Sequence, residues 1–187
     1  MTPQLWVFAG PNGAGKSTFV ERYVAGRIPV LNPDNIARQL PGGSDAQRMI
    51  GAGRIAVAER QRLIAEHESF VTETTLSGKS ELELMRTART AGYKINLIYI
   101  GLGDVAYSIG RVRSRVESGG HEVPLVDLLR RFSRSLGNLP TAMALADRVL
   151  LFDNSGTRRQ LLLSQEQDRL KFRATTPPQW ALPLLHT

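Results

Sequence analysis

The sequence contains no cysteine and only three histidines, which lie far apart. Without cysteine there are no disulfide bonds, no thiolate catalysis and no cysteine-ligated zinc, which agrees with a cytosolic address. No apolar run reaches the roughly 18 residues that a membrane-spanning helix needs. A strand-like pattern begins almost at the first residue, where a secretory leader would stand. We therefore expect a soluble, cytoplasmic protein with no membrane partner.

Aromatic residues are also few, at 6% of the chain, which leaves little surface on which nucleic-acid bases would stack. Basic residues are plentiful: 24 lysines and arginines outnumber 17 acidic residues, for a net charge of +7. This balance indicates an anionic partner or a solvated basic surface, and nucleotides, phosphosugars and nucleic acids all satisfy it. Because aromatic residues are scarce, we expect a small phosphorylated ligand rather than nucleic acid.

A glycine-rich stretch with the pattern G-x-x-x-x-G-K-[ST] follows the apolar run at residues 5–9 and precedes a helix-like segment. Its glycines adopt backbone angles that turn successive N–H groups inward, and the helix that follows adds its positive dipole, so the loop holds phosphates. The alternative, a purely structural turn, gives no reason for the Gly-Lys-Ser ending. We expect ATP to be bound by Gly10, Pro11, Asn12, Gly13, Ala14, Gly15, Lys16, Ser17 and Thr18.

Two side chains of this loop have expected roles of their own. Lys16 reaches the β- and γ-phosphates, and the Ser17 hydroxyl is a ligand of Mg²⁺. The cofactors predicted from the motif are therefore ATP and Mg²⁺.

Apolar strand-like segments alternate with helix-like segments along the chain, which predicts a parallel sheet covered on both faces. Strands are expected at residues 5–9, 28–31, 69–72, 94–100 and 148–152. Helices are expected at about 16–25, 34–40, 45–67, 79–91, 104–117 and 125–136, with a separate helical piece near 139–146. The predicted fold class is α/β, a P-loop NTPase or kinase fold with a five-stranded, mainly parallel sheet and an arginine-bearing helical lid.

The length is that of one domain. We expect a single P-loop kinase domain over residues 1–174, with the lid at about 111–137, and an extended tail over 175–187 with Trp180 as its anchor. In the helix expected at 45–67, one stripe recurs at helical spacing and is expected to be buried. It consists of Met49, Ile50, Gly53, Ala56, Val57, Arg60, Leu63 and Ile64.

Polar residues follow the ends of three predicted strands, and those after the last strand are Asp153 and Asn154. Asp34 comes after the second, where its carboxylate is a candidate general base for a hydroxyl that attacks the γ-phosphate; capping of the next helix is the alternative. Glu73 comes after the third, where it is a candidate ligand of Mg²⁺ or of substrate hydroxyls, or the partner of a helix end or an arginine. Thr75 is a turn residue or a ligand. Because parallel strands place their carboxyl ends at one edge, these groups are expected to share a cleft.

Arginines concentrate between residues 111 and 134. Arg111 and Arg115 share a helix face, as do Arg130 and Arg134, and like charges at this spacing repel unless an anion lies between them. The pattern favours a phosphate-clamping lid. The alternative is a solvated face in which Asp127 pairs with a neighbouring arginine.

Together, these motifs resemble the zeta toxin family. The resemblance covers about residues 6–155 and rests on the glycine-rich loop together with the stretches 32–37, 73–78, 119–124 and 153–155. It implies a kinase that uses ATP and Mg²⁺ to phosphorylate a sugar hydroxyl of UDP-N-acetylglucosamine, held inactive by a small antitoxin protein.

Matched by motif, the resemblance implies that Asp34 is the catalytic base and that Glu73 and Thr75 bind substrate. It also implies that Arg111 faces the phosphates. The family's second lid arginine corresponds to His121 here, and the charge in its place is expected from Arg115, Arg131 or Arg134. The residues by themselves leave open a kinase of another small hydroxylated molecule, or a nucleotide-binding or nucleic-acid-binding protein without kinase activity.

Overall fold

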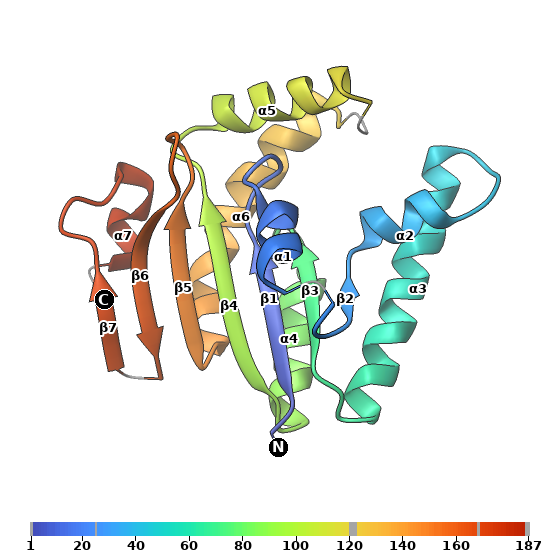
Figure 1. Cartoon of the computed structure of the whole chain (residues 1–187), viewed down its shortest axis with the longest axis horizontal. Coiled ribbons are helices and arrows are strands. Elements are labelled where there is room, and N and C mark those ends of the chain that lie inside the picture. Colours follow the sequence, from blue (N-terminus) through green and yellow to red (C-terminus); the bar gives the residue numbers. More distant parts are fainter. Residues whose placement is uncertain (1, 25, 120–122, 168, 186–187) are drawn as a thin grey trace.

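The computed structural model describes residues 2–24, 26–119, 123–167 and 169–185. At its centre is one sheet of seven strands in the order β2-β3-β1-β4-β5-β6-β7. The five strands from β2 to β5 in this order run parallel, and their carboxyl ends meet at one edge (Figure 1). They are β1 (Gln4–Ala9), β2 (Val30–Leu31), β3 (Phe70–Thr74), β4 (Lys94–Gly101) and β5 (Arg148–Asp153).

The α/β fold with a mainly parallel sheet is as predicted, but the number of strands is not. β6 (Gln160–Glu166) pairs antiparallel with β5, and β7 (Arg169–Arg173) pairs antiparallel with β6. Every residue of β7 is exposed, so its sequence lacks the apolar run by which a buried strand is recognised. No helix separates these strands, so the alternation of strands and helices gives no signal for them.

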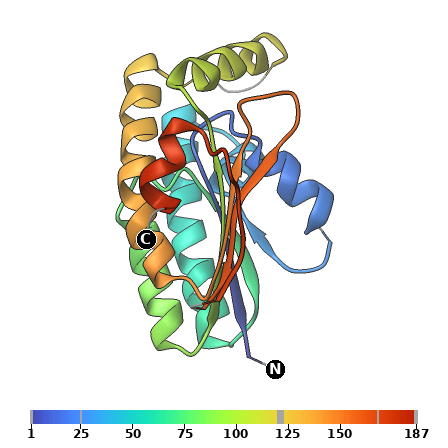
Figure 2. The same cartoon turned by 90° about the vertical axis from the view of Figure 1, so that its left-hand side faces the viewer.

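Helices lie on both faces of the sheet (Figures 1 and 2). One face is covered by α1, and the other by α4, α6 and α7, while α5 crosses over the carboxyl ends of the strands and α2 and α3 stand beside β2. The helices are α1 (Lys16–Tyr23), α2 (Pro33–Gln39), α3 (Asp45–Ala65), α4 (Ser80–Thr90), α5 (Val105–Glu117), α6 (Leu125–Leu145) and α7 (Leu182–Leu185). Within the described ranges, no helix is both long and apolar enough to cross a bilayer.

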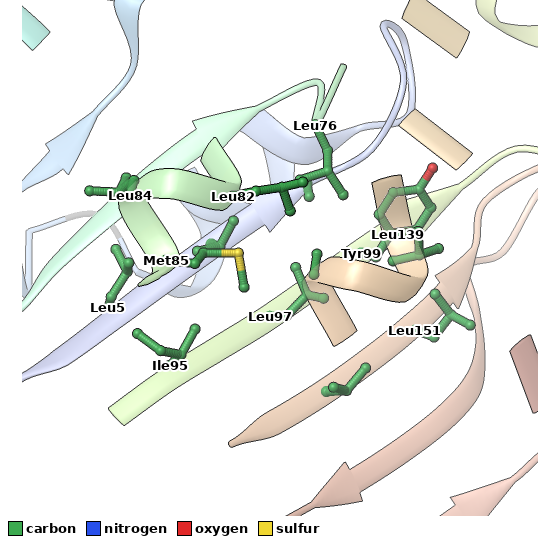
Figure 3. Close-up of a cluster of buried hydrophobic side chains, with 14 of the residues drawn as sticks. Leu5, Leu76, Leu82, Leu84, Met85, Ile95, Leu97, Tyr99, Leu139 and Leu151 are labelled. Carbon is green, nitrogen blue, oxygen red and sulfur yellow. The ribbon is translucent and has the colours of Figure 1, made fainter. Parts of the chain in front are cut away.

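The larger hydrophobic core lies between the sheet and α4 and α6 (Figure 3). Leu97 of β4, Met85 of α4 and Leu139 of α6 are all 0% exposed. Truncating such a side chain to alanine costs about 2–5 kcal/mol, so this core fixes the strands whose ends carry the polar groups. A smaller core under α1 includes Phe8 and Val20 and supports the start of that helix.

The prediction that two helical pieces follow residue 124 is wrong. α6 is one helix of 21 residues with Pro140 inside it. Proline removes one backbone hydrogen bond of the helix, but Leu139 and Ala142 on either side are fully buried against the core and hold the helix together. Tertiary packing thus overrides the local break.

The expected stripe of α3 is buried only in part. Ala56, Arg60 and Leu63 are buried, whereas Met49, Ile50 and Val57 are exposed. The first half of the helix extends beyond the sheet and packs on α2, so fewer of its side chains meet the core (Figure 1).

The C-terminal segment is not an extended tail. It forms a short 3-10 helix (Gln179–Ala181) followed by α7, and Trp180 anchors it. The Trp180 indole N–H donates to Asp153 Oδ1 at 2.9 Å, and the ring lies over Gly101, where an added Cβ would be 2.3 Å from it. A side chain at position 101 would therefore displace the tryptophan.

We expect Trp180→Ala to lower the free energy of unfolding by about 3 kcal/mol, because it leaves a cavity over Gly101 and removes one of the two hydrogen bonds that Asp153 Oδ1 accepts. Trp180→Phe, which loses only the hydrogen bond and part of the ring, is the matched control and should cost about half as much. Urea unfolding measures both. Equal stability of the alanine variant and the parent would show that the segment is not anchored in this way.

Candidate active site

The glycine-rich loop forms a backbone cradle between β1 and α1. Gly10, Gly13 and Gly15 all have positive φ, at 141°, 74° and 89°. A Cβ on Gly10 would lie 2.1 Å from the carbonyl oxygen of Ile100, so only glycine allows the loop to leave β1 so close to β4. Gly15 is the N-cap of α1, so the free N–H groups of the helix begin at the cradle.

Lys16 is buried beside this cradle. Its ammonium donates hydrogen bonds to the carbonyl oxygens of Gly10 at 2.9 Å and Pro11 at 3.0 Å. Burial lowers the pKa of Lys16 from 10.5 to about 8, and the negative charges of Glu73 and Asp34 only partly oppose this shift. The side chain is thus held where anionic phosphates would favour its charged form.

We expect ATP binding to be accompanied by proton uptake between about pH 8 and pH 10. In this range part of the free Lys16 is neutral, and neighbouring phosphates raise its pKa, so the complex binds a proton that the free protein lacks. The affinity for ATP should consequently fall as the pH rises above about 8. Titration calorimetry in two buffers of different ionisation enthalpy measures the uptake.

The matched control is Lys16→Arg, whose cation does not titrate in this range, so its binding should show no proton uptake. Binding enthalpies that are the same in both buffers for the parent protein at about pH 9 would contradict the lowered pKa of Lys16.

Ser17 and Glu73 meet at the mouth of the cradle. The Ser17 hydroxyl donates a hydrogen bond of 2.7 Å to Glu73 Oε1, which joins the start of α1 to the end of the neighbouring strand β3. A hydroxyl and a carboxylate both offer oxygen atoms, which are the ligands that Mg²⁺ prefers, so this pair fits a magnesium ion bound with ATP.

Asp34 does not cap α2. The N-cap is the buried Asn32, whose Oδ1 accepts from the backbone N–H of Asp34 at 2.9 Å, and Pro33 occupies the first helical position. The Asp34 carboxylate is consequently left for the cavity that it lines. Of the two interpretations of Asp34 from the sequence, capping is wrong.

A cavity of about 430 Å³ opens beside the loop and brings most of the predicted site residues together. Thr75 lies on its wall with its hydroxyl 2.8 Å from that of Ser77. Gly10, Pro11 and Ala14 are buried and do not line the cavity, and neither does Arg134, which is exposed. The predicted residues that line the cavity are Asn12, Gly13, Gly15, Lys16, Ser17, Thr18, Asp34, Glu73, Thr75, Arg111, Arg115 and Arg131.

The arginines of α5 and α6 separate into two kinds. Arg111 is half-buried and donates to the carbonyl oxygens of Gly13 at 3.2 Å and Asn154 at 2.6 Å, which ties the loop after β5 to the phosphate cradle. Arg130 instead forms an ion pair of 2.6 Å with Asp127, which was the alternative interpretation of this cluster. His121 lies outside the described residues.

Sequence reasoning missed three charged residues of the cavity wall: Arg38, Arg60 and Glu81. Arg38 follows Asp34 by four residues on α2, a spacing that places both on one helix face. This spacing could have identified Arg38 as a residue of the cavity wall. Arg60 belongs to the buried stripe of α3, where a charged residue is an unusual occupant.

Two chains of solved structures have a fold similar to this one. A chain in the crystal structure of AvrRxo1-ORF1:-ORF2 with ATP matches with a TM-score of 0.73 and 18% identity, over 91% of this chain and 60% of that one. A chain from the PezAT chromosomal toxin-antitoxin system of Streptococcus pneumoniae matches with a TM-score of 0.64 and 17% identity, over 84% of this chain and 71% of that one. This chain thus spans about 60% of the AvrRxo1 complex chain. At these identities the likeness is one of fold.

Comparison of the sequence with known proteins shows the family. An uncharacterized protein of Haemophilus influenzae is 36% identical over 125 residues, which cover 63% of this chain and 89% of that protein. Residues 5–133 match the AAA domain family AAA_33, and this match includes the phosphate cradle, Asp34, Glu73 and Arg131. The chain therefore belongs to the AAA domain family AAA_33.

Proposed function

We propose that the protein is a phosphotransferase that moves the γ-phosphate of ATP to a hydroxyl of a small acceptor. The observation that carries this proposal is the position of Asp34: its carboxylate, released from capping by Asn32, lines the same cavity as Lys16 and the phosphate cradle. The cavity volume of about 430 Å³ is that of a small-molecule site.

In the proposed reaction, the Asp34 carboxylate accepts the proton of the acceptor hydroxyl as its oxygen forms a bond to the γ-phosphorus. The bond between that phosphorus and the β–γ bridging oxygen breaks, and ADP leaves with the electron pair. Lys16 and the backbone N–H groups of the cradle hold the phosphates in place, so the chain's main contribution is positioning and charge stabilisation.

Ser17 and Glu73 are the residues that would hold a magnesium ion bound with ATP, since they place two oxygen groups at the mouth of the cradle. The ion would neutralise phosphate charge.

We assign the helices α5 and α6 the role of a lid over the phosphates. Arg111, Arg115 and Arg131 all line the cavity from these helices, and their guanidinium groups suit charge that develops on the transferring phosphate. Arg134 has no part in this proposal because it lies outside the cavity wall.

For the acceptor, we propose a sugar nucleotide such as UDP-N-acetylglucosamine, as the resemblance to zeta toxins implies. The same resemblance motivates an antitoxin partner, and the PezAT structure comes from a toxin-antitoxin system.

ADP release measured with ATP and Mg²⁺ tests the reaction type. We expect release to depend on an added hydroxylated acceptor and to be greatest with UDP-N-acetylglucosamine. Greatest release with another acceptor would reject the sugar nucleotide and retain the kinase, whereas release that no acceptor stimulates would reject both.

A further inference from the structure

Arg60 is a buried cation whose hydrogen bonds are mostly unmade. It lies in the second half of α3, is 8% exposed, and lines the cavity. Its Nη2 donates to Thr72 Oγ1 at 2.9 Å, while its buried Nε has no hydrogen-bond partner. Within the described ranges, it forms no ion pair with a carboxylate. Of the five donor hydrogens of this guanidinium, the structure thus shows one in a hydrogen bond within the protein.

Such an arrangement is costly for a purely structural residue. Burial removes water from the guanidinium and lowers its pKa, and the charge of Glu81 opposes this shift only in part. Buried charges in proteins are normally paired, and an apolar residue of similar size at this position would pack at lower cost. An anion bound in the cavity would supply the missing partner.

A second arginine stands on the same wall. Arg38 of α2 lines the cavity one helical turn after Asp34, and α2 packs against α3, which carries Arg60. These helices stand beside β2, whereas the arginine-bearing α5 crosses over the phosphate cradle (Figure 1). The cavity therefore has two basic regions, one at the cradle and one at α2 and α3.

We propose that Arg60 and Arg38 bind an oxyanion group of the acceptor, a phosphate or a carboxylate, and so hold its hydroxyl near Asp34. This inference rests on the proposed phosphotransferase function, because it takes the cavity beside the cradle as the acceptor site. The planar guanidinium forms paired hydrogen bonds with either oxyanion. The acceptor is thus an anionic hydroxyl compound, and its negative charge contributes to binding separately from the transferred phosphate.

Titration calorimetry on the full chain, saturated with a non-hydrolysable ATP analogue and Mg²⁺, tests this proposal without any turnover. The phosphate probe is UDP, with uridine as its neutral counterpart, and the carboxylate probe is glucuronate, with glucose as its counterpart. We expect at least one anionic probe to bind more tightly than its counterpart. Arg60→Gln should weaken that binding by about tenfold or more, and Arg38→Gln should weaken it less.

The matched control is Thr72→Val, which removes the partner that Arg60 has within the protein but leaves the guanidinium in place. Thr72→Val should retain the affinity for the anionic probe within about twofold. Thr72→Val and Arg60→Gln should both bind the ATP analogue with the parental affinity. Equal binding of neutral and anionic probes, or equal loss in Thr72→Val and Arg60→Gln, would overturn the proposal. Because the readout is binding, a protein that binds UDP through Arg60 but transfers no phosphate would contradict the proposed function and leave the subsite standing.

Discussion

Replacing Asp34 with asparagine is expected to slow phosphate transfer by about 10²- to 10⁴-fold, the usual contribution of a general base. The amide has nearly the same shape and keeps the backbone N–H bond to Asn32, so the cavity should not change. Affinity for ATP should stay within about twofold, because the cradle and Lys16 are intact. Single-turnover transfer and equilibrium ATP binding, measured on the same preparations, separate the two effects.

Asn35→Ala is the matched control for Asp34→Asn, because it changes the next residue of the same helix, which is exposed and does not line the cavity. It should transfer phosphate at close to the parental rate. If Asp34→Asn also does so, Asp34 is not the base and the proton of the hydroxyl goes elsewhere.

Replacing Lys16 with methionine is expected to weaken ATP binding by about 100-fold and to lower turnover by a further 10²- to 10³-fold. The physical reason is the loss of the cation that the fold holds beside the cradle at the cost of desolvation. Fluorescence titration with an ATP analogue measures the affinity, and ADP formation at saturating ATP measures the turnover.

The same substitution should raise stability at pH 7. A buried lysine whose pKa falls from 10.5 to about 8 binds protons less well when folded, which costs on the order of 3 kcal/mol below both values. This penalty lessens as the pH rises from about 8 toward 10.5, because the unfolded chain then loses its extra proton. Lys16→Met should therefore gain more stability at pH 7 than at about pH 10. A destabilised variant that retains ATP affinity would contradict both the burial cost and the role of Lys16.

Residues that act through local chemistry could be predicted from the sequence. Lys16 and Ser17 belong to a motif whose spacing itself creates the phosphate cradle, and Asp34 and Glu73 follow strands whose carboxyl ends must meet in a parallel sheet. The hydrogen bond between Ser17 and Glu73 is a direct result of β1 and β3 being neighbours.

Residues whose surroundings depend on long-range packing could not be predicted. Arg60 is placed by α3, and whether it meets solvent, a carboxylate or a cavity depends on how α2 and α3 stand beside β2. The choice between Asn32 and Asp34 as the helix cap depends on where the helix begins, which propensity alone fixes only to within a few residues. Pro140 misleads because packing against the core overrides a local break in the helix. Strand β7 misleads because it is exposed along its whole length and lacks the continuous apolar run of a buried strand.

Mass spectrometry of a panel of hydroxylated acceptors, each incubated with the protein, ATP and Mg²⁺, tests the central claim most directly. The panel contains UDP-N-acetylglucosamine and neutral sugars, and every reaction is repeated with Asp34→Asn. We predict that UDP-N-acetylglucosamine gains the mass of one phosphoryl group with the parent protein and not with the variant. ATP hydrolysed to free phosphate at the same rate by both proteins, with no acceptor gaining mass, would contradict the assignment of this cavity as a phosphotransferase site.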